Sequence, residues 1–296
     1  MLVQTALSPT KFDKNASTFV AIGATYEGRD FDLLERMLPL VDYIEVTPET
    51  IAEVNDHEIT LSDEVMTELK NIGKARQIVV HGVGLSIGSH EGWSPTYFHL
   101  LDDFLEQVDV AWHSEHLGYT KVDDQHLGIM LAMPKTEEVL DMVCERVNKI
   151  QQRYNLPFLL ENIVHVIPDF PGDFSEARFL NALVDRTGCG LILDVYNLQC
   201  DAHNHGFDIP RFLNELQLTN VRELHVACGV EHNGFLLDVH SQLTRSSTVQ
   251  LAQDVVRRSE GSAEVVVYEF MPEAVPGLGR DAIAEELGRL RVAFRN

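Results

Sequence analysis

Short apolar runs alternate along the chain with longer segments that have a helical pattern. The apolar runs predict eight strands, at 19–24, 43–47, 77–81, 108–113, 157–161, 190–195, 221–226 and 264–269. Runs without a clean alternation of apolar and polar residues are typical of strands that are covered on both faces. Helices are predicted between them, at 30–40, 61–72, 95–108, 136–154, 175–187, 209–216, 244–259 and 280–294. Several helices open at residues that favour helix starts, including Asp30, Ser94 and Ser175.

Eight strand–helix alternations in 296 residues predict an α/β protein with a (β/α)₈ barrel, the TIM barrel. We predict one domain over residues 1–296, with a short N-terminal extension at 1–18. A doubly wound open sheet is the alternative. It usually has fewer strands and a glycine-rich phosphate loop after the first one, and Gly23-Ala24-Thr25 is no such loop.

Composition narrows the class of protein further. Hydrophobic residues make up 45% of the chain, which is enough for a large core and excludes a disordered or collagen-like chain. Lys and Arg number 23 against 46 Asp and Glu, so the formal net charge is −23. A surface this acidic repels phosphate backbones, so we expect no nucleic-acid partner.

The cysteines and the apolar segments predict a cytoplasmic protein. The four cysteines form no CxxC pair, which favours a reducing compartment. The first 14 residues lack the charged start and apolar core of a signal peptide. No run approaches 18 apolar residues, so no membrane span is expected.

Chemically active side chains gather where the predicted strands end. Active sites of such barrels lie at the C-terminal ends of the strands. The residues at or just beyond these ends are Glu45, Glu49, His81, Glu115, His116, Glu161, Asn162, Asp194, Asn197, His225, Asp238, His240 and Glu269. Each alone fits a structural role, because a single strand-end histidine is more often a hydrogen-bonded core residue. Together, so many carboxylates and imidazoles would repel or stay desolvated without cations, and we therefore predict a metal site.

The ligand types limit which metals fit. The best candidates comprise three or four histidines and four carboxylates, more than one ion requires, which suggests two or three metals that share bridging carboxylates. Imidazole with carboxylate suits zinc, iron or manganese. Such sites serve both iron-dependent oxygen chemistry and metal hydrolysis, and residue types and spacing leave that choice open.

Two motifs carry a family resemblance, His81-Gly-Val-Gly-Leu-Ser86 and Ser114-Glu-His-Leu117. Weaker matches occur at 159–162, 193–197, 204–206, 223–227 and 238–240. Over residues 19–269 the chain resembles the multinuclear non-haem iron-dependent oxidative enzymes. This is the peptide-modifying barrel family that includes the methanobactin-biosynthesis oxidase. The resemblance implies a barrel of the xylose-isomerase-like superfamily. It also implies two or three iron ions of mixed Fe(II)/Fe(III) valence, with O₂ as co-substrate.

The resemblance also implies a substrate and a role for each residue. The substrate is a ribosomally synthesised precursor peptide, modified at a Cys or at a C-terminal Asp or Asn. The implied ligands are His81, His116 and Glu161 for one iron, the bridging Glu161 with Asp194, His225 and Glu269 for a second, and Asn197, Asp238 and His240 for a third. Glu115 and Asn162 would orient neighbouring ligands. His205 either lines the substrate mouth or packs beneath a loop.

Partners and alternatives complete the expectations. Members of this family commonly work with a separate protein that recognises the leader of the precursor, so such a partner is implied. The chain departs from many relatives at Thr47-Pro48-Glu49, where they carry a histidine. The same ligand layout is similar to zinc apurinic endonucleases and sugar isomerases, so a divalent-metal hydrolase or isomerase is the alternative. The charge disfavours an endonuclease, and no lysine ends a strand as in many sugar isomerases. A barrel with purely structural metals is less favoured, since structural sites are usually closed.

Overall fold

Eight parallel strands form a closed barrel in the computed structural model, which describes residues 20–55, 58–123 and 125–295. The barrel strands are β1 (Ala21–Thr25), β2 (Tyr43–Val46), β5 (Gln77–Gly82), β6 (His113–His116), β9 (Phe158–Glu161), β10 (Gly190–Asp194), β11 (Val221–Val226) and β14 (Val265–Tyr268). They follow one another around the barrel in chain order, and β14 closes it by pairing with β1. The closed parallel sheet confirms the predicted fold class.

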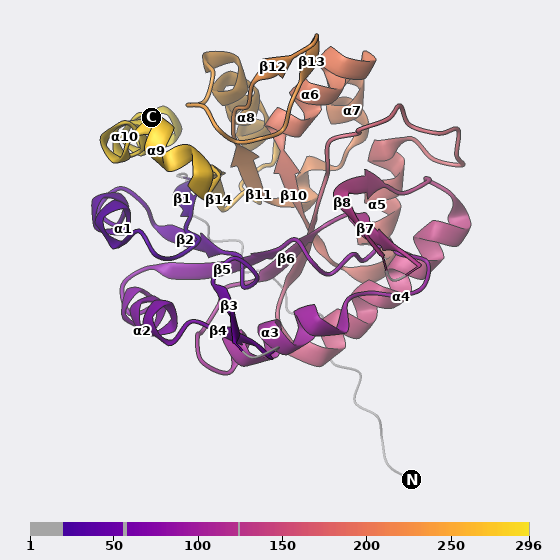
Figure 1. The fold of residues 1–296 in the computed structure, drawn as a ribbon. Helices are drawn as coiled ribbons and strands as arrows, with labels where there is room; N and C mark the ends of the chain where they lie inside the picture. The colour runs from indigo at the N-terminus through magenta and orange to yellow at the C-terminus, as the bar shows by residue number, and fades with distance from the viewer. Residues whose placement is uncertain (1–19, 56–57, 124, 296) are drawn as a thin grey trace.

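Helices surround this barrel on the outside (Figure 1). They are α1 (Phe31–Met37), α2 (Asp63–Ile72), α3 (Pro95–Leu105), α4 (Glu137–Tyr154), α5 (Glu176–Thr187), α6 (Val195–His205), α7 (Ile209–Glu215), α8 (Ser246–Arg258), α9 (Val275–Leu278) and α10 (Arg280–Arg295). The carboxylate of Asp30 and the hydroxyl of Ser175 accept the expected capping bonds from α1 and α5. Ser94 makes no side-chain cap, and α3 begins instead with Pro95, whose missing N–H costs nothing in a first turn.

The interior of the barrel is built in two layers. Six side chains form an apolar plug, namely Val79, Trp112, Leu159, Ile192, Val265 and Val267. Successive side chains of a strand point to opposite faces, so the residue two positions further along shares the face of the plug. Two positions beyond Val79, Leu159, Ile192 and Val267 stand His81, Glu161, Asp194 and Glu269. The polar layer therefore lies directly above the plug, toward the C-terminal ends of the strands.

The structure corrects two predicted elements. The fourth strand was predicted at 108–113, but β6 runs over His113–His116. The prediction followed the apolar run before His113. The strand itself is polar, and its position is determined by pairing with β5 and β9. Helix α6 was not predicted, although Asp194 caps its start and Gly206 ends it at φ 71°.

Three short hairpins lie in the connections that follow barrel strands. They are β3 (Ala52–Asn55) with β4 (Glu58–Leu61), β7 (Gly118–Val122) with β8 (Gln125–Ala132), and β12 (Glu231–His232) with β13 (Phe235–Leu236). The 3₁₀ helices η1 (Leu218–Asn220) and η2 (Pro272–Ala274) complete the described elements. The single-domain assignment of 1–296 stays a prediction, and the predicted extension at 1–18 lies outside the described residues. Within the described part, no helix is both long and apolar enough to cross a membrane.

Candidate metal centre

Two histidines face one carboxylate at the mouth of the barrel. Nε2 of His81 lies 2.8 Å from Oε2 of Glu161, and Nε2 of His116 lies 3.4 Å from the same oxygen. The other ring nitrogen of each histidine is already engaged. Nδ1 of His81 lies 3.0 Å from the hydroxyl of Ser114, and Nδ1 of His116 lies 3.1 Å from the carbonyl oxygen of Gly82. Both rings are thereby turned so that Nε2 points to Glu161.

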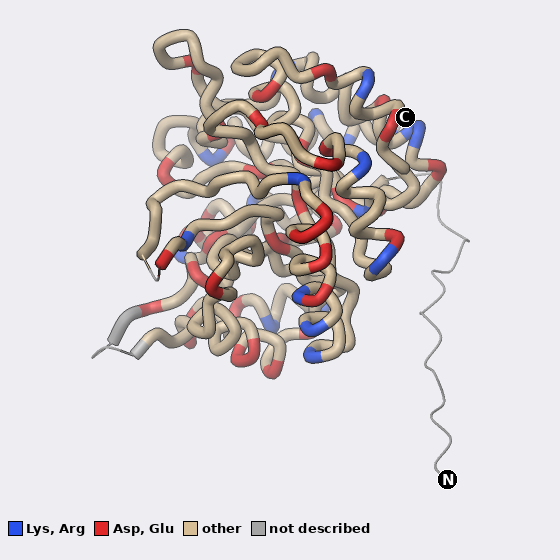
Figure 2. Tube along the Cα trace, turned by 90° about the vertical axis from the view of Figure 1, so that its right-hand side faces the viewer, with Lys and Arg blue, Asp and Glu red and all other residues tan. Residues whose placement is uncertain are grey.

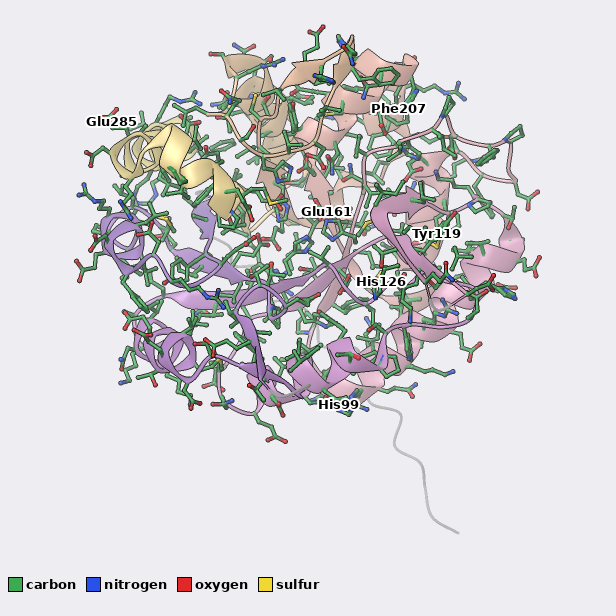
Figure 3. All side chains as sticks on the ribbon, viewed as in Figure 1. His99, Tyr119, His126, Glu161, Phe207 and Glu285 are labelled. Atoms are coloured by element: carbon green, nitrogen blue, oxygen red, sulfur yellow. The ribbon has the colours of Figure 1, made fainter. Side chains whose placement is uncertain are left out.

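Glu161 lies near the middle of the barrel in Figure 3 and belongs to two groups of potential metal ligands. Its second oxygen, Oε1, lies 3.2 Å from Nδ1 of His225, which in turn lies 3.0 Å from Glu269. Asp194 completes this second group, whose four potential ligand atoms all lie within 4.8 Å of one another. The carboxylate of Glu161 is therefore placed to bridge two cations.

The third predicted set is assembled in part. Nε2 of His240 lies 2.5 Å from Asp238, and its Nδ1 lies 3.4 Å from Glu269. His240 adopts φ 40°, a left-handed conformation that is uncommon outside glycine and that is often found at functional sites. Asn197 is held at the start of α6, where its N–H donates to Asp194 over 2.7 Å. Its side-chain nitrogen donates to the carbonyl of Asn162.

The inward-facing atoms of these residues have no hydrogen-bond partner among the described residues outside this cluster, and they contact only one another. They are His81 Nε2, Glu161 Oε2, Asp194 Oδ2, Asn197 Oδ1, His225 Nδ1, Asp238 Oδ1, both ring nitrogens of His240, and Glu269 Oε2. Buried polar atoms are normally paired, because leaving one without a partner costs about 1–3 kcal/mol. Buried nitrogen and oxygen atoms that have only one another as neighbours fit a site for bound metal ions.

The electrostatics of the centre agree with this fit. Burial, together with the charges of Asp238 and Glu161, raises the pKa of Asp194 well above its ordinary value. Burial lowers the pKa of His81, but the Glu161 carboxylate outweighs it and raises that pKa to about 9. The carboxylates therefore require positive charge nearby, which protonated histidines or bound cations supply.

Glu115 and Asn162 hold the framework of the centre. Glu115 is fully buried and accepts hydrogen bonds from the backbone N–H groups of Leu85 and His116. Burial raises its pKa well above the usual range. The side chain of Asn162 exchanges two hydrogen bonds with the backbone of Asp194, at 2.9 and 3.0 Å. Both residues thus fix the strand ends that carry ligands.

His205 lies apart from this cluster. Its Nε2 is 2.7 Å from the carbonyl oxygen of His165, and its ring packs edge-on against Phe235. Of the two positions considered for it, the contacts favour packing beneath a loop.

A further histidine–carboxylate group already contains a cation. The group comprises His165, Asp169 and Glu176. The ammonium of the buried Lys135 lies 2.9 Å from His165, 2.9 Å from Asp169 and 2.7 Å from Glu176. The chain itself supplies the positive charge here, so this group is a structural network between loops.

Two carboxylates lie behind His225, and neither was predicted to orient this histidine. Nε2 of His225 lies 3.1 Å from Glu45 and 3.6 Å from Glu223, and all three side chains are buried. Glu223 also accepts the indole N–H of Trp112 over 2.7 Å. Glu45 could be recognised as a strand-end carboxylate. Nothing in the sequence indicated that it contacts His225, which lies 180 residues further along the chain.

The chain is similar to known proteins in both sequence and fold. A family model described as "RiPP precursor modification enzyme MbnB/TglH/ChrH" matches residues 22–278. A protein of Anaeromyxobacter sp., named as a UPF0276 protein, is 29% identical over 82% of this chain and 82% of its own length. A UPF0276 protein of Caulobacter vibrioides is 31% identical over 71% of this chain and 72% of its own length. A xylose isomerase domain containing protein from Salmonella typhimurium superposes with a TM-score of 0.64 and 12% identity, covering 95% and 99% of the two chains. This last likeness agrees with the closed (β/α)₈ barrel fold.

Proposed function

The chain belongs to the MbnB/TglH/ChrH family of RiPP precursor modification enzymes, and we propose that its reaction is an iron- and O₂-dependent oxidation of one peptide residue. The target would be a Cys, or a C-terminal Asp or Asn, of a ribosomally synthesised precursor. The observation that carries the proposal is the set of buried nitrogen and oxygen atoms around Glu161 that face only one another.

We propose three ligand sets in this arrangement. They are His81, His116 and Glu161; Glu161, Asp194, His225 and Glu269; and Asn197, Asp238 and His240. Imidazole and carboxylate ligands without thiolates suit iron. When bound, iron would supply electrons, act as a Lewis acid and serve as a template for the reacting groups.

The residues of the chain would orient and shield this chemistry. Ser114, the Gly82 carbonyl and Glu45 fix the directions of three imidazoles through their outer nitrogens. The apolar plug beneath the centre excludes water from the lower part of the barrel. Reagents would therefore reach the ligands from the mouth.

The surface around the mouth suits a polypeptide substrate. Among the described residues, every exposed large hydrophobic side chain except Val292 lies in a segment between a barrel strand and the following helix. Examples are Ile129, Phe170 and Phe235. Apolar side chains concentrated on one face commonly mark an interaction site. A separate protein that recognises the leader of the precursor is part of the proposal.

Metal analysis tests the proposal directly. We expect anaerobically purified protein to contain two or three iron ions per chain and to consume O₂ when a precursor peptide encoded beside its gene is added. Stoichiometric zinc, with no oxygen uptake after iron reconstitution, would contradict the oxidative reaction. That result would favour the hydrolase or isomerase alternative.

Substitution of ligands tests the assignment itself. His116→Ala removes a ligand of the first set and Asp238→Ala a ligand of the third, so each should lower the bound iron by about one ion. His99→Ala, which removes an exposed histidine of α3, serves as control and should keep the full metal content. Unchanged iron in both ligand variants would show that the assignment is wrong.

A further inference from the structure

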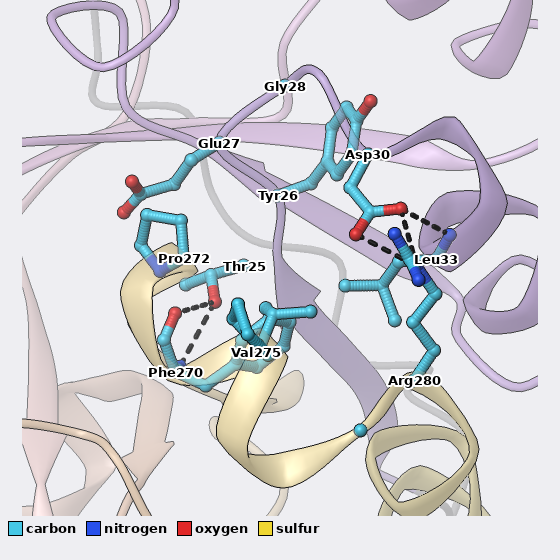
Figure 4. A pocket seen from close by; sticks show the side chains of 12 residues that line it. Thr25, Tyr26, Glu27, Gly28, Asp30, Leu33, Phe270, Pro272, Val275 and Arg280 are labelled. Atoms are coloured by element: carbon cyan, nitrogen blue, oxygen red, sulfur yellow. Dashed lines mark hydrogen bonds and ion pairs between the residues drawn. The ribbon is translucent and has the colours of Figure 1, made fainter.

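A cavity of about 310 Å³ opens between the segment after β1 and the segment after β14 (Figure 4). Most of its wall is apolar and is formed by Tyr26, Leu33, Phe270, Pro272, Val275 and Pro276. The two segments are joined by the Thr25 hydroxyl, which donates to the carbonyl of Phe270 and accepts from its N–H. Volume and lining fall within the range of small ligand sites.

Three charged side chains line this cavity, and two of them pair with each other. Asp30 and Arg280 form an ion pair on one side, with Nε of Arg280 2.8 and 3.0 Å from the two carboxylate oxygens. The carboxylate of Glu27 stands away from this pair (Figure 4) and has no hydrogen-bond or ion-pair partner among the described residues. The cavity therefore offers a carboxyl group without a partner among the described residues, beside apolar walls.

The cavity adjoins the proposed metal centre. Phe270 in its wall directly follows the candidate ligand Glu269. Burial is the main cause that raises the pKa of Glu27 to about 7, and the charges of Glu269, Glu273 and Glu45 add to it. A substrate residue at the centre would thus have a sequence neighbour within reach of this cavity.

We propose that the cavity binds a basic side chain, Lys or Arg, of the precursor peptide, with Glu27 as its ionic partner. The inference rests on the proposed function only in taking the substrate to be a peptide. Basic side chains pack their alkyl stems along apolar surface and keep the charged head at a polar group. A charge-assisted hydrogen bond to a half-buried carboxylate would select them over neutral side chains of the same length.

Binding of short capped peptides to the metal-loaded full chain tests this without turnover. The probes are acetylated pentapeptide amides of alanine with a central lysine, arginine or norleucine. Norleucine matches the length of lysine but carries no charge. We expect the lysine and arginine peptides to bind about tenfold or more tightly than the norleucine peptide, as measured by NMR titration at low salt. Glu27→Gln should remove this preference and leave the metal content unchanged.

Glu273→Gln is the matched control, because it removes a nearby carboxylate that does not line the cavity. It should retain most of the preference for the basic peptides. Equal binding of the lysine and norleucine peptides by the wild type would overturn the proposal, as would an unchanged preference in Glu27→Gln. The outcome is independent of the oxidative proposal, because neither iron identity nor oxygen uptake enters the measurement.

Discussion

At the scale of single residues, the candidate centre depends on what lies behind each ligand. His225 illustrates this, because its Nδ1 faces Glu161 and Glu269 while its Nε2 faces Glu45. A carboxylate behind a metal-bound imidazole fixes the ring and its tautomer, and raises its basicity. If the proposed second ligand set holds a metal, Glu45 would therefore position His225 within it.

Replacing Glu45 by Gln should weaken metal binding. Gln keeps the shape of the side chain but lacks the charge that holds His225 in place, and loss of such outer partners typically lowers metal affinity about 10- to 100-fold. The measurement is the iron retained during titration with a competing chelator, with the iron spectrum recorded alongside and folding checked by circular dichroism.

Glu285→Gln provides the control for this experiment. Glu285 is an exposed carboxylate on α10, so its replacement should leave iron retention unchanged. A Glu45→Gln protein that folds normally and retains iron as the wild type does would show that Glu45 has no positioning role.

The sequence indicated which polar residues lie at the strand ends better than it indicated which residues contact each other across the barrel. His81, Glu161 and Asp194 could be found because a chemically distinctive residue stands where an apolar strand ends. The partnership of Glu45 with His225 could not, because strands β2 and β11 are separated by other strands around the barrel and meet only through its interior. Side-chain contacts across the interior leave no local pattern.

At the scale of secondary-structure elements, the end of β5 and the end of β6 are packed too closely for a side chain at Gly82. A Cβ atom there would overlap the hydroxyl of Tyr97 and the carboxylate of Glu115. The Gly82 carbonyl also lies beside Nδ1 of His116. The glycine thus allows the two strand ends to present His81 and His116 side by side.

Gly82→Ala should destabilise the protein and disturb the first ligand set. Overpacking at a buried site costs about 1–3 kcal/mol, which thermal unfolding would detect. Iron content should fall as His116 moves. Gly288→Ala on α10, where a Cβ meets nothing within 4 Å, is the control and should be neutral or slightly stabilising. Wild-type stability in Gly82→Ala would contradict the close packing described here.

The sequence pattern misplaced β6 and missed α6 for different reasons. The strand β6 consists of His113, Ser114, Glu115 and His116, a composition that has low intrinsic preference for a buried strand. Pairing with β5 and β9 determines it instead. Helix α6 had local signals in Asp194 and Gly206, but Asp194 was considered only as a ligand or a loop residue. It serves as a cap through Oδ1 and leaves Oδ2 free for a metal.

At the scale of the whole molecule, the charge of −23 has two components. Figure 2 shows Asp and Glu spread over helices and loops, where water screens them. The other component is the buried set that includes Glu161, Asp194 and Glu269. Carboxylates in this second set cannot be screened by water, so their repulsion acts on the folded barrel itself.

Removal of metal should therefore lower the stability of the entire barrel. Ligands that bind only the folded state stabilise it by mass action, by about 4 kcal/mol at a thousandfold excess over the dissociation constant. Chelation should lower the Tm of the holoprotein by about 5 °C or more, and anaerobic addition of Fe(II) should restore it. Glu161→Gln is the informative comparison, since it removes the carboxylate proposed to bridge two ions and part of the repulsion together. Its Tm should respond much less to the chelator. A wild-type Tm that is indifferent to chelation would mean that the buried carboxylates are balanced by protons on the histidines alone.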